Sequence, residues 1–261
     1  MTQTKTHTNE KETKMTTSPI RMQQRPMEED LNPNRRTAVL VGALFLISTA
    51  TFIVSNALIT PLLDSPNSLA AVANHSQLMI AATLIGLIEG IATVGIAVAL
   101  YPILKWQHPA LALGYAGMRI AELAVAAVGF GLGGLLLVTL SATAPNGANS
   151  ETLGILLVAL RPWTLMLVYI YTAIGGLMLS YMLLRTRLVP RGLSVLGLIG
   201  YAALLLAAVL DMLGFIDLVA GPGLAWLVPG GLFELLLPIW LFVRGFNLTA
   251  SDRMRLARVS G

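Results

Sequence analysis

Five ionisable side chains fall inside long apolar stretches of this sequence, where a charge is costly and therefore informative. They are Glu89, Arg119, Glu122, Asp211 and Glu234. If these stretches cross a membrane, a charged side chain near the bilayer centre costs at least about 2.5–3.5 kcal/mol. Because lipid-facing positions would not tolerate five such groups, we expect these side chains to face the interior of a helical bundle.

Arg119 and Glu122 form the pair with the best-defined geometry. They are three residues apart and therefore share one face of a helix. One interpretation is structural: Arg119 neutralises one or more glutamates and holds helices together. The other is functional and rests on charge, because four carboxylates face one guanidinium. The surplus acids must then be protonated, hydrated, or paired with a bound cation or cationic ligand, which is compatible with a proton-linked role.

The remaining residue types exclude several kinds of chemistry. Cysteine is absent, which excludes disulfides, thiolate metal sites and cysteine nucleophiles. The histidines, His7, His75 and His108, lie away from the centres of the apolar stretches, which argues against a core haem or metal held by histidine. The sequence contains no phosphate-binding glycine loop, zinc-protease motif or serine-hydrolase elbow. We therefore expect no cofactor and no metal site, and we name no catalytic residue.

Composition identifies the elements that must position these charges. Of the 261 residues, 56% are hydrophobic and only 11% are charged, whereas soluble domains carry about 25% charged residues. Several windows of about 20 residues or more contain at most one or two charges, which is the length needed to cross a hydrocarbon core. They lack the alternation of barrel strands. The sequence therefore predicts an all-α, polytopic transmembrane helical bundle.

Six spans are expected in this bundle. Their ranges are 37–59, 78–104, 111–140, 162–184, 193–218 and 224–243. Residues 151–160 are apolar but too short to span. With Ser150 as a helix cap and Glu151 in the first turn, they predict a short helix at the membrane interface. The expected domains are a disordered cytoplasmic tail over 1–34, the six-helix transmembrane domain over 35–247 and a basic cytoplasmic tail over 248–261.

The positive charges predict the orientation of these spans, because Lys and Arg accumulate on the cytoplasmic side of a membrane. If the N-terminus is inside, six spans return the C-terminus inside, and the outer side holds only Arg161. The inner side then holds Arg35, Arg36, Lys105, Arg185, Arg187, Arg191, Arg244, Arg253, Arg255 and Arg258. We expect a multi-pass protein of the cytoplasmic membrane with both termini cytoplasmic. The net charge of +4 follows this rule and does not indicate nucleic-acid binding.

Short motifs distributed between Arg35 and Asn247 resemble those of a known family. They are Tyr101-Pro102-Ile103-Leu104-Lys105, Gly114-Tyr115 with Arg119 and Glu122, Leu188-Val189-Pro190-Arg191-Gly192-Leu193-Ser194 with Gly197, and Glu234 ahead of Trp240-Leu241 and Gly245-Phe246. The combination is similar to that of a family of mostly bacterial membrane proteins, catalogued as domain of unknown function 4386. This resemblance implies a multi-span protein of a bacterial inner membrane and implies no catalytic residue.

Three functions are compatible with these observations. The first is a membrane protein that handles a small molecule or ion through a polar core of Arg119, Glu122, Glu89 and Glu234, with Asp211 nearer the outer side. The second is a membrane scaffold or interaction protein whose buried charges only specify helix pairing. The third is an intramembrane lipid-modifying enzyme, although the sequence favours a protein without enzymatic activity. The expected partners are the lipid bilayer and a small-molecule or ionic ligand, with the oligomeric state open.

Overall fold

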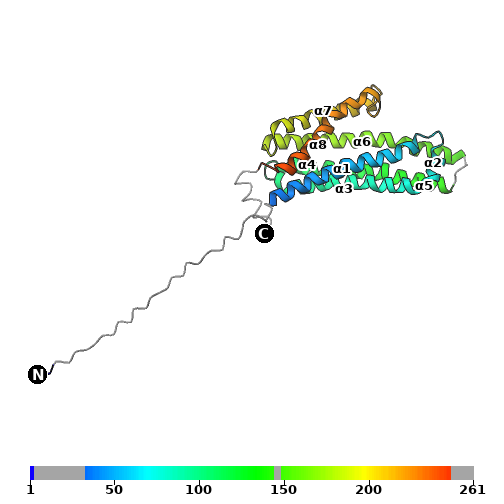
Figure 1. Ribbon diagram of the computed structural model, residues 1–261. Helices are drawn as coiled ribbons and strands as arrows, with labels where there is room; N and C mark the ends of the chain where they lie inside the picture. Colours follow the sequence, from blue (N-terminus) through cyan, green and yellow to red (C-terminus); the bar gives the residue numbers. More distant parts are fainter. Residues whose placement is uncertain (3–32, 144–147, 248–261) are drawn as a thin grey trace. The chain divides into compact units, whose positions relative to one another are not determined.

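A computed structural model describes residues 1–2, 33–143 and 148–247, and all regular structure in these ranges is helical (Figure 1). The elements in chain order are α1 (Pro33–Leu63), α2 (Ser68–Asn74), α3 (Ser76–Leu104), α4 (Pro109–Ala126), the π-helical segment η1 (Ala127–Leu132), α5 (Gly133–Thr143), α6 (Ala148–Thr186), α7 (Arg191–Met212), the 3₁₀ segment η2 (Gly221–Leu227) and α8 (Val228–Val243). The tails predicted over 1–34 and 248–261 fall almost entirely outside the described residues.

Six segments of the described chain are long and apolar enough to cross a membrane. They are Arg35–Leu63, Ser76–Leu104, Pro109–Thr143, Asn149–Thr186, Arg191–Met212 and Gly221–Val243. They are helical because a bilayer offers no water to the backbone, so that a continuous apolar run satisfies its N–H and C=O groups within its own helix. The prediction of an all-α bundle with six spans is confirmed.

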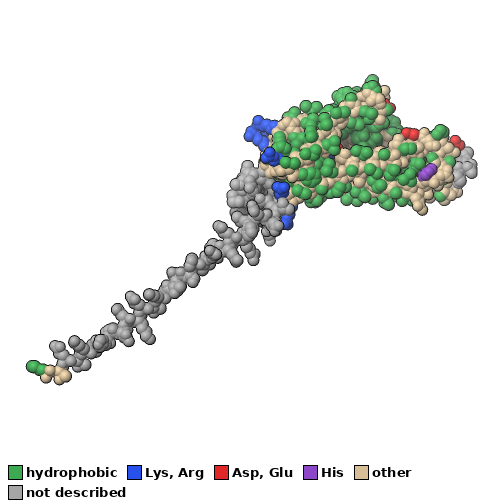
Figure 2. Space-filling model, viewed as in Figure 1, with side chains coloured by type: hydrophobic (Ala, Val, Ile, Leu, Met, Phe, Trp, Pro, Cys, Tyr) green, Lys and Arg blue, Asp and Glu red, His purple; other side chains and the backbone are tan. Residues whose placement is uncertain are grey.

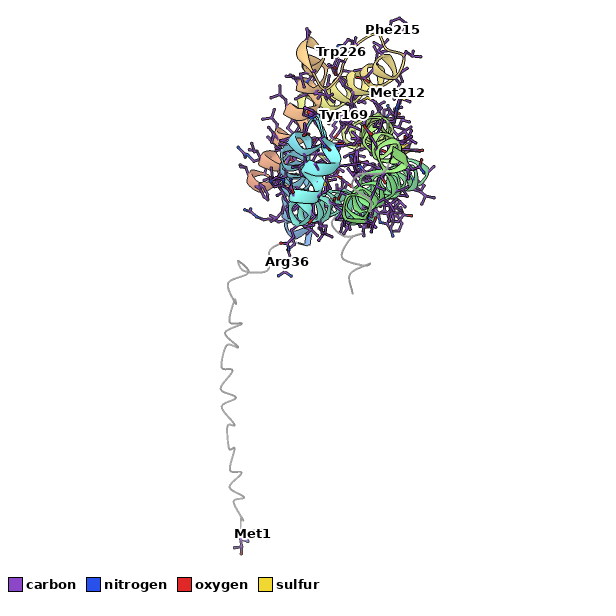
Figure 3. The ribbon with its side chains drawn as sticks, turned by 90° about the vertical axis from the view of Figure 1, so that its right-hand side faces the viewer. Met1, Arg36, Tyr169, Met212, Phe215 and Trp226 are labelled. Atoms are coloured by element: carbon purple, nitrogen blue, oxygen red, sulfur yellow. The ribbon has the colours of Figure 1, made fainter. Side chains whose placement is uncertain are left out.

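The six spans form a closed ring. Along the ring α1 packs on α3, α3 on α4, α4 on α6, α6 on α7 and α7 on α8, and α8 returns to α1. Figure 3 looks along the helices and shows the yellow and orange helices α7 and α8 beside the blue-to-cyan and green ones. Because every span contacts the next, each turns one face towards a common interior.

Glycine and proline set several of the helix ends. Pro109 lies in the first turn of α4, and Pro190 immediately precedes α7. These are positions where a missing backbone N–H costs nothing. Gly245 follows α8 with a φ of 70° and donates its N–H to the carbonyl of Leu241 at 3.0 Å. A residue with a Cβ atom at position 245 would be strained in this left-handed conformation, which glycine adopts freely.

The fourth span differs most from the sequence prediction. Residues 151–160 do not form a separate interfacial helix, because they continue into α6, which is 39 residues long. At 1.5 Å per residue this helix measures about 58 Å, nearly twice the hydrocarbon core of about 30 Å. The polar Arg161 does not break it, since Nη2 of Arg161 donates to Oδ1 of Asn56 on α1 at 2.6 Å. The guanidinium also lies over the ring of Phe130 at 4.9 Å.

The third and sixth spans contain irregular segments where the prediction had uninterrupted helices. In the third, η1 is wound as a π-helix between α4 and α5. Its Gly129 lies against the side chain of Thr164 in α6, at a place where a Cβ atom would not fit. In the sixth, η2 is wound as a 3₁₀ helix before α8 begins.

The fifth span is shorter than predicted. The prediction extended it to Leu218, but α7 ends at Met212. Gly214, with a φ of 78°, turns the chain there, and its N–H bonds to the carbonyl of Asp211 at 2.8 Å. The Asp211 carboxylate also accepts the N–H of Leu218 at 2.6 Å. The polar residue therefore closes a turn at the end of the helix.

Basic and acidic side chains separate towards opposite ends of the helical part. Figure 2 shows Lys and Arg at one end and Asp, Glu and His at the other. The described basic residues include Arg185, Arg187 and Arg191, which flank the connection between α6 and α7. The separation agrees with the charge pattern of the sequence, and the cytoplasmic placement of the basic end stays a prediction.

Candidate functional site

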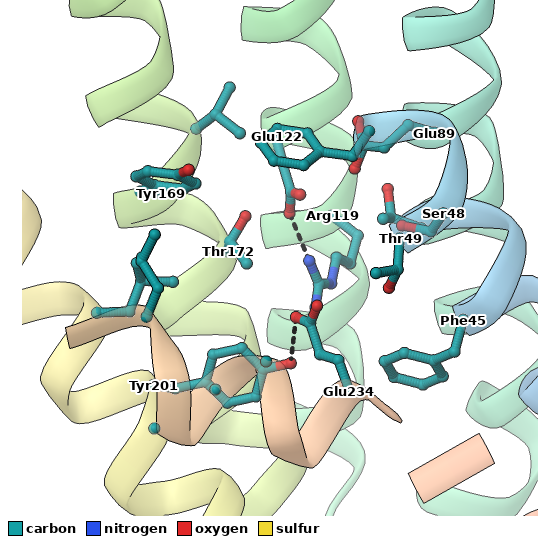
Figure 4. Close-up of a pocket in the computed structure, with 18 of the residues that line it drawn as sticks. Phe45, Ser48, Thr49, Glu89, Arg119, Glu122, Tyr169, Thr172, Tyr201 and Glu234 are labelled. Atoms are coloured by element: carbon teal, nitrogen blue, oxygen red, sulfur yellow. Dashed lines mark hydrogen bonds and ion pairs between the residues drawn. The ribbon is translucent and has the colours of Figure 1, made fainter. Parts of the chain in front are cut away.

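The ring of spans surrounds a partly open cavity with a volume of about 180 Å³ (Figure 4). All six spans line it, and one lining residue from each is Phe45 (α1), Glu89 (α3), Arg119 (α4), Tyr169 (α6), Tyr201 (α7) and Glu234 (α8). An ordered water needs only roughly 10–15 Å³ on this measure, and an engineered apolar cavity of about 150 Å³ binds benzene. The cavity therefore has room for several waters or one small organic molecule.

Arg119 and Glu122 lie on one wall of this cavity. Nη1 of Arg119 donates to Oε2 of Glu122 at 2.7 Å, and both residues are 2% exposed. They share the inner face of α4, as their spacing predicts. The Nε–H of Arg119 has no hydrogen-bond partner among the described residues. The ion pair therefore lies within one helix, and part of the guanidinium stays unpaired.

Glu234 reaches the same cavity from α8. The Tyr201 hydroxyl on α7 donates to its Oε1 at 3.1 Å, and the Tyr201 ring meets Phe233 edge to face, with centroids 5.7 Å apart. The two helices touch at this level, because a Cβ atom on Gly200 would lie 2.5 Å from the backbone N of Gly230. A close backbone contact and a buried tyrosine thus hold the Glu234 carboxyl at the cavity.

Glu89 is the third carboxyl, contributed by α3. Its side chain is half-buried, and within the described part of the chain it makes no hydrogen bond or ion pair. Glu89 also lines a smaller cavity of about 30 Å³ on the side of Asn56 and Arg161. It therefore lies between the central cavity and the Arg161–Asn56 hydrogen bond.

Asp211, the fifth candidate residue, lies elsewhere. It does not line the cavity, and its carboxylate accepts the Leu218 N–H in the turn after α7. The structure therefore brings Glu89, Arg119, Glu122 and Glu234 together from three spans and leaves Asp211 apart.

Aromatic and hydroxyl side chains complete the lining, and the sequence prediction, which rested on charged residues, did not include them. The aromatic ones are Phe45, Phe52, Tyr169, Tyr201 and Trp226, and the hydroxyl ones include Ser48, Thr49, Thr93 and Thr172. Thr93 could have been found, because it follows Glu89 by four residues and shares its helix face. Trp226 had no such signal, since it comes from the unpredicted 3₁₀ segment η2.

The arrangement does not resemble a metal centre. Among the residues that the structure describes, no group of three or more His, Cys, Asp or Glu side chains is placed to hold a metal ion. The described residues that line the cavity contribute three carboxyl groups and one guanidinium. Such an arrangement can bind a proton, waters or a cation through charge and aromatic surface, without a fixed coordination geometry.

Comparison with known proteins gives a family and no further detail. No curated protein and no solved structure shows a significant match to this chain. One family model matches residues 40–245, a range that contains Glu89, Arg119, Glu122 and Glu234 of the cavity. The chain therefore belongs to the family described as Domain of unknown function (DUF4386).

Proposed function

We propose that this integral membrane protein binds and handles a small molecule or ion in the cavity at the centre of its ring of spans. The observation that carries the proposal is the convergence of Glu89, Glu234 and the Arg119–Glu122 pair on one cavity. Protein interiors are normally close-packed, and charges in a membrane are expensive. A cavity lined by such costly groups is the arrangement expected of a ligand site.

The geometry of the ion pair supports this function over a purely structural one. A pair that only specified helix pairing would join two helices, but Arg119 and Glu122 both belong to α4. Buried ion pairs can often be replaced by apolar residues without loss of stability, so retaining one inside a single helix has no evident packing benefit. We therefore place the role of the pair in the cavity that it lines.

We propose further that the protein resides in the cytoplasmic membrane of a bacterium with its basic end and both termini inside. The support is the accumulation of Lys and Arg at one end of the helical part (Figure 2), together with the similarity to a mostly bacterial family. We propose the domain limits at 35–247 for the membrane part, with tails over 1–34 and 248–261. The match to residues 40–245 lies inside these limits.

Native mass spectrometry of the full chain released from detergent tests the ligand site. We expect a bound small molecule on the wild-type protein and on Asp211→Asn, which removes a carboxylate from a residue outside the cavity. The adduct should be absent from the folded double variant Arg119→Leu/Glu122→Leu. An adduct of the same mass and occupancy on that double variant would contradict the proposal.

A further inference from the structure

We propose that the ligand of this cavity is a small organic cation: an amine or quaternary ammonium ion of up to about eight non-hydrogen atoms, a size set by cavities known to hold benzene. Its positive charge lies within reach of the Glu89 and Glu234 carboxyl groups and of aromatic rings in the cavity wall. The inference rests on the proposed function and narrows it to one chemical class.

Charge balance points to a cation. The Arg119 guanidinium is engaged by Glu122 at 2.7 Å, whereas neither Glu89 nor Glu234 forms an ion pair with another described residue. Two carboxyl groups outside this ion pair therefore face the cavity, and its lining carries three carboxyl groups against one guanidinium. Charges interact strongly where water is scarce, so a cation gains most from this lining and an anion would be repelled by it.

The aromatic lining points to an organic cation. The rings are Phe45, Phe52, Tyr169, Tyr201 and Trp226. An ammonium ion over a ring face is attracted by the electron density of that face, and the attraction is stronger when the ion is removed from water. A divalent metal ion instead needs several oxygen ligands in a defined geometry, and no group of described residues offers one.

Isothermal titration calorimetry on the full-length protein, in detergent free of phospholipid, tests the charge requirement. The probes are choline, ethanolamine and tetramethylammonium, with two isosteres of choline: the neutral 3,3-dimethylbutan-1-ol and the anionic 3,3-dimethylbutanoate. We expect at least one ammonium probe to bind about tenfold or more tightly than the isosteres, the ratio for about 1.4 kcal/mol. This comparison needs no variant and so does not depend on folding of a mutant.

Variants place the binding in the cavity. Glu89→Gln and Glu234→Gln should each weaken binding of the ammonium probe about tenfold or more, whereas Asp211→Asn, the same change outside the cavity, should leave it unaltered. Thr172→Phe, which adds a ring to a residue of the cavity wall, should abolish binding. Ammonium binding that is insensitive to both glutamate variants would overturn the inference.

The remaining outcomes separate the inference from the proposed function. Equal binding of choline and both isosteres, abolished by Thr172→Phe, would overturn the cationic ligand and keep the ligand cavity. Failure of every probe, charged or neutral, would overturn both. Ammonium groups also occur in phospholipid headgroups, so the assay is repeated in nanodiscs with phosphatidylethanolamine. Competition by this lipid identifies a headgroup as the source of the ammonium, and undiminished binding identifies a free amine.

Discussion

Replacing Arg119 by leucine should destabilise this protein more than replacing its partner Glu122. The reason is that one arginine serves three acids in the cavity. Arg119 interacts electrostatically with Glu89 and Glu234 as well as with Glu122. In Arg119→Leu, three carboxyl groups lose their common counter-charge. In Glu122→Leu, the arginine loses one hydrogen bond of 2.7 Å and keeps two other carboxyl groups nearby.

The expected magnitudes follow from this difference. Removing one partner of a buried ion pair costs about 3–5 kcal/mol, and we expect Arg119→Leu to lie in that range. Losing a hydrogen bond to a charged group costs about 1.5–3 kcal/mol, which is the range for Glu122→Leu. The double variant should recover about 1–3 kcal/mol relative to Arg119→Leu, because Glu122 is no longer buried without a partner.

Reversible unfolding in mixed detergent micelles measures these free energies for the wild type and the three variants. Because a protonated carboxyl needs no counter-charge, the deficit of Arg119→Leu should shrink from alkaline to acidic pH. The free-energy costs of substitutions at residues in contact are not expected to add. The double variant measures how far the two costs depart from their sum. If Glu122→Leu costs as much as Arg119→Leu, or if the two costs simply add, Arg119 is not the shared counter-charge of the three carboxyl groups.

Two further predictions address the ring and its orientation. Gly200→Ala should cost about 1–3 kcal/mol in the same unfolding assay, because the new Cβ would lie 2.5 Å from the Gly230 backbone; the control Gly192→Ala, with no atom within 4 Å of its Cβ, should change little. The chain has no cysteine, so single cysteines report topology directly. In intact cells an impermeant maleimide should label Ala73→Cys and spare Gln107→Cys, and the reverse pattern would contradict a cytoplasmic N-terminus.

The number of spans could be predicted from the sequence because it depends on local composition. Each apolar run must satisfy its own backbone in lipid, so the run itself defines the helix. The predicted break at Arg161 was wrong for a non-local reason. Its side chain is satisfied by Asn56 on α1 and by Phe130 in η1, partners more than 100 and about 30 positions earlier in the sequence that no local pattern identifies.

The candidate site was partly predictable for the same reason. The helical period places Arg119 and Glu122 on one face, and the cost of charge in lipid directs both towards the interior. The sequence pattern cannot show that α8 closes the ring on α1, which brings Glu234 to the cavity. Asp211 resembled the other four by composition, but it lies in the last turn of α7, where its carboxylate accepts the Leu218 N–H from the turn that follows.

The pairing of Arg119 within its own helix has a consequence for how the cavity could respond to a ligand. A bridge from Arg119 to Glu234 would have tied α4 to α8 across the cavity, but the Arg119–Glu122 ion pair joins no two helices. Glu89 on α3 and Glu234 on α8 lie near Arg119 but form no ion pair with it. A bound cation would join the α3 and α8 walls directly. A ligand that binds only the folded state raises the free energy of unfolding by about 2.7 kcal/mol at a concentration of a hundred times its Kd. A bound cation should therefore stabilise the ring, because it attracts the carboxyl groups of two of its helices.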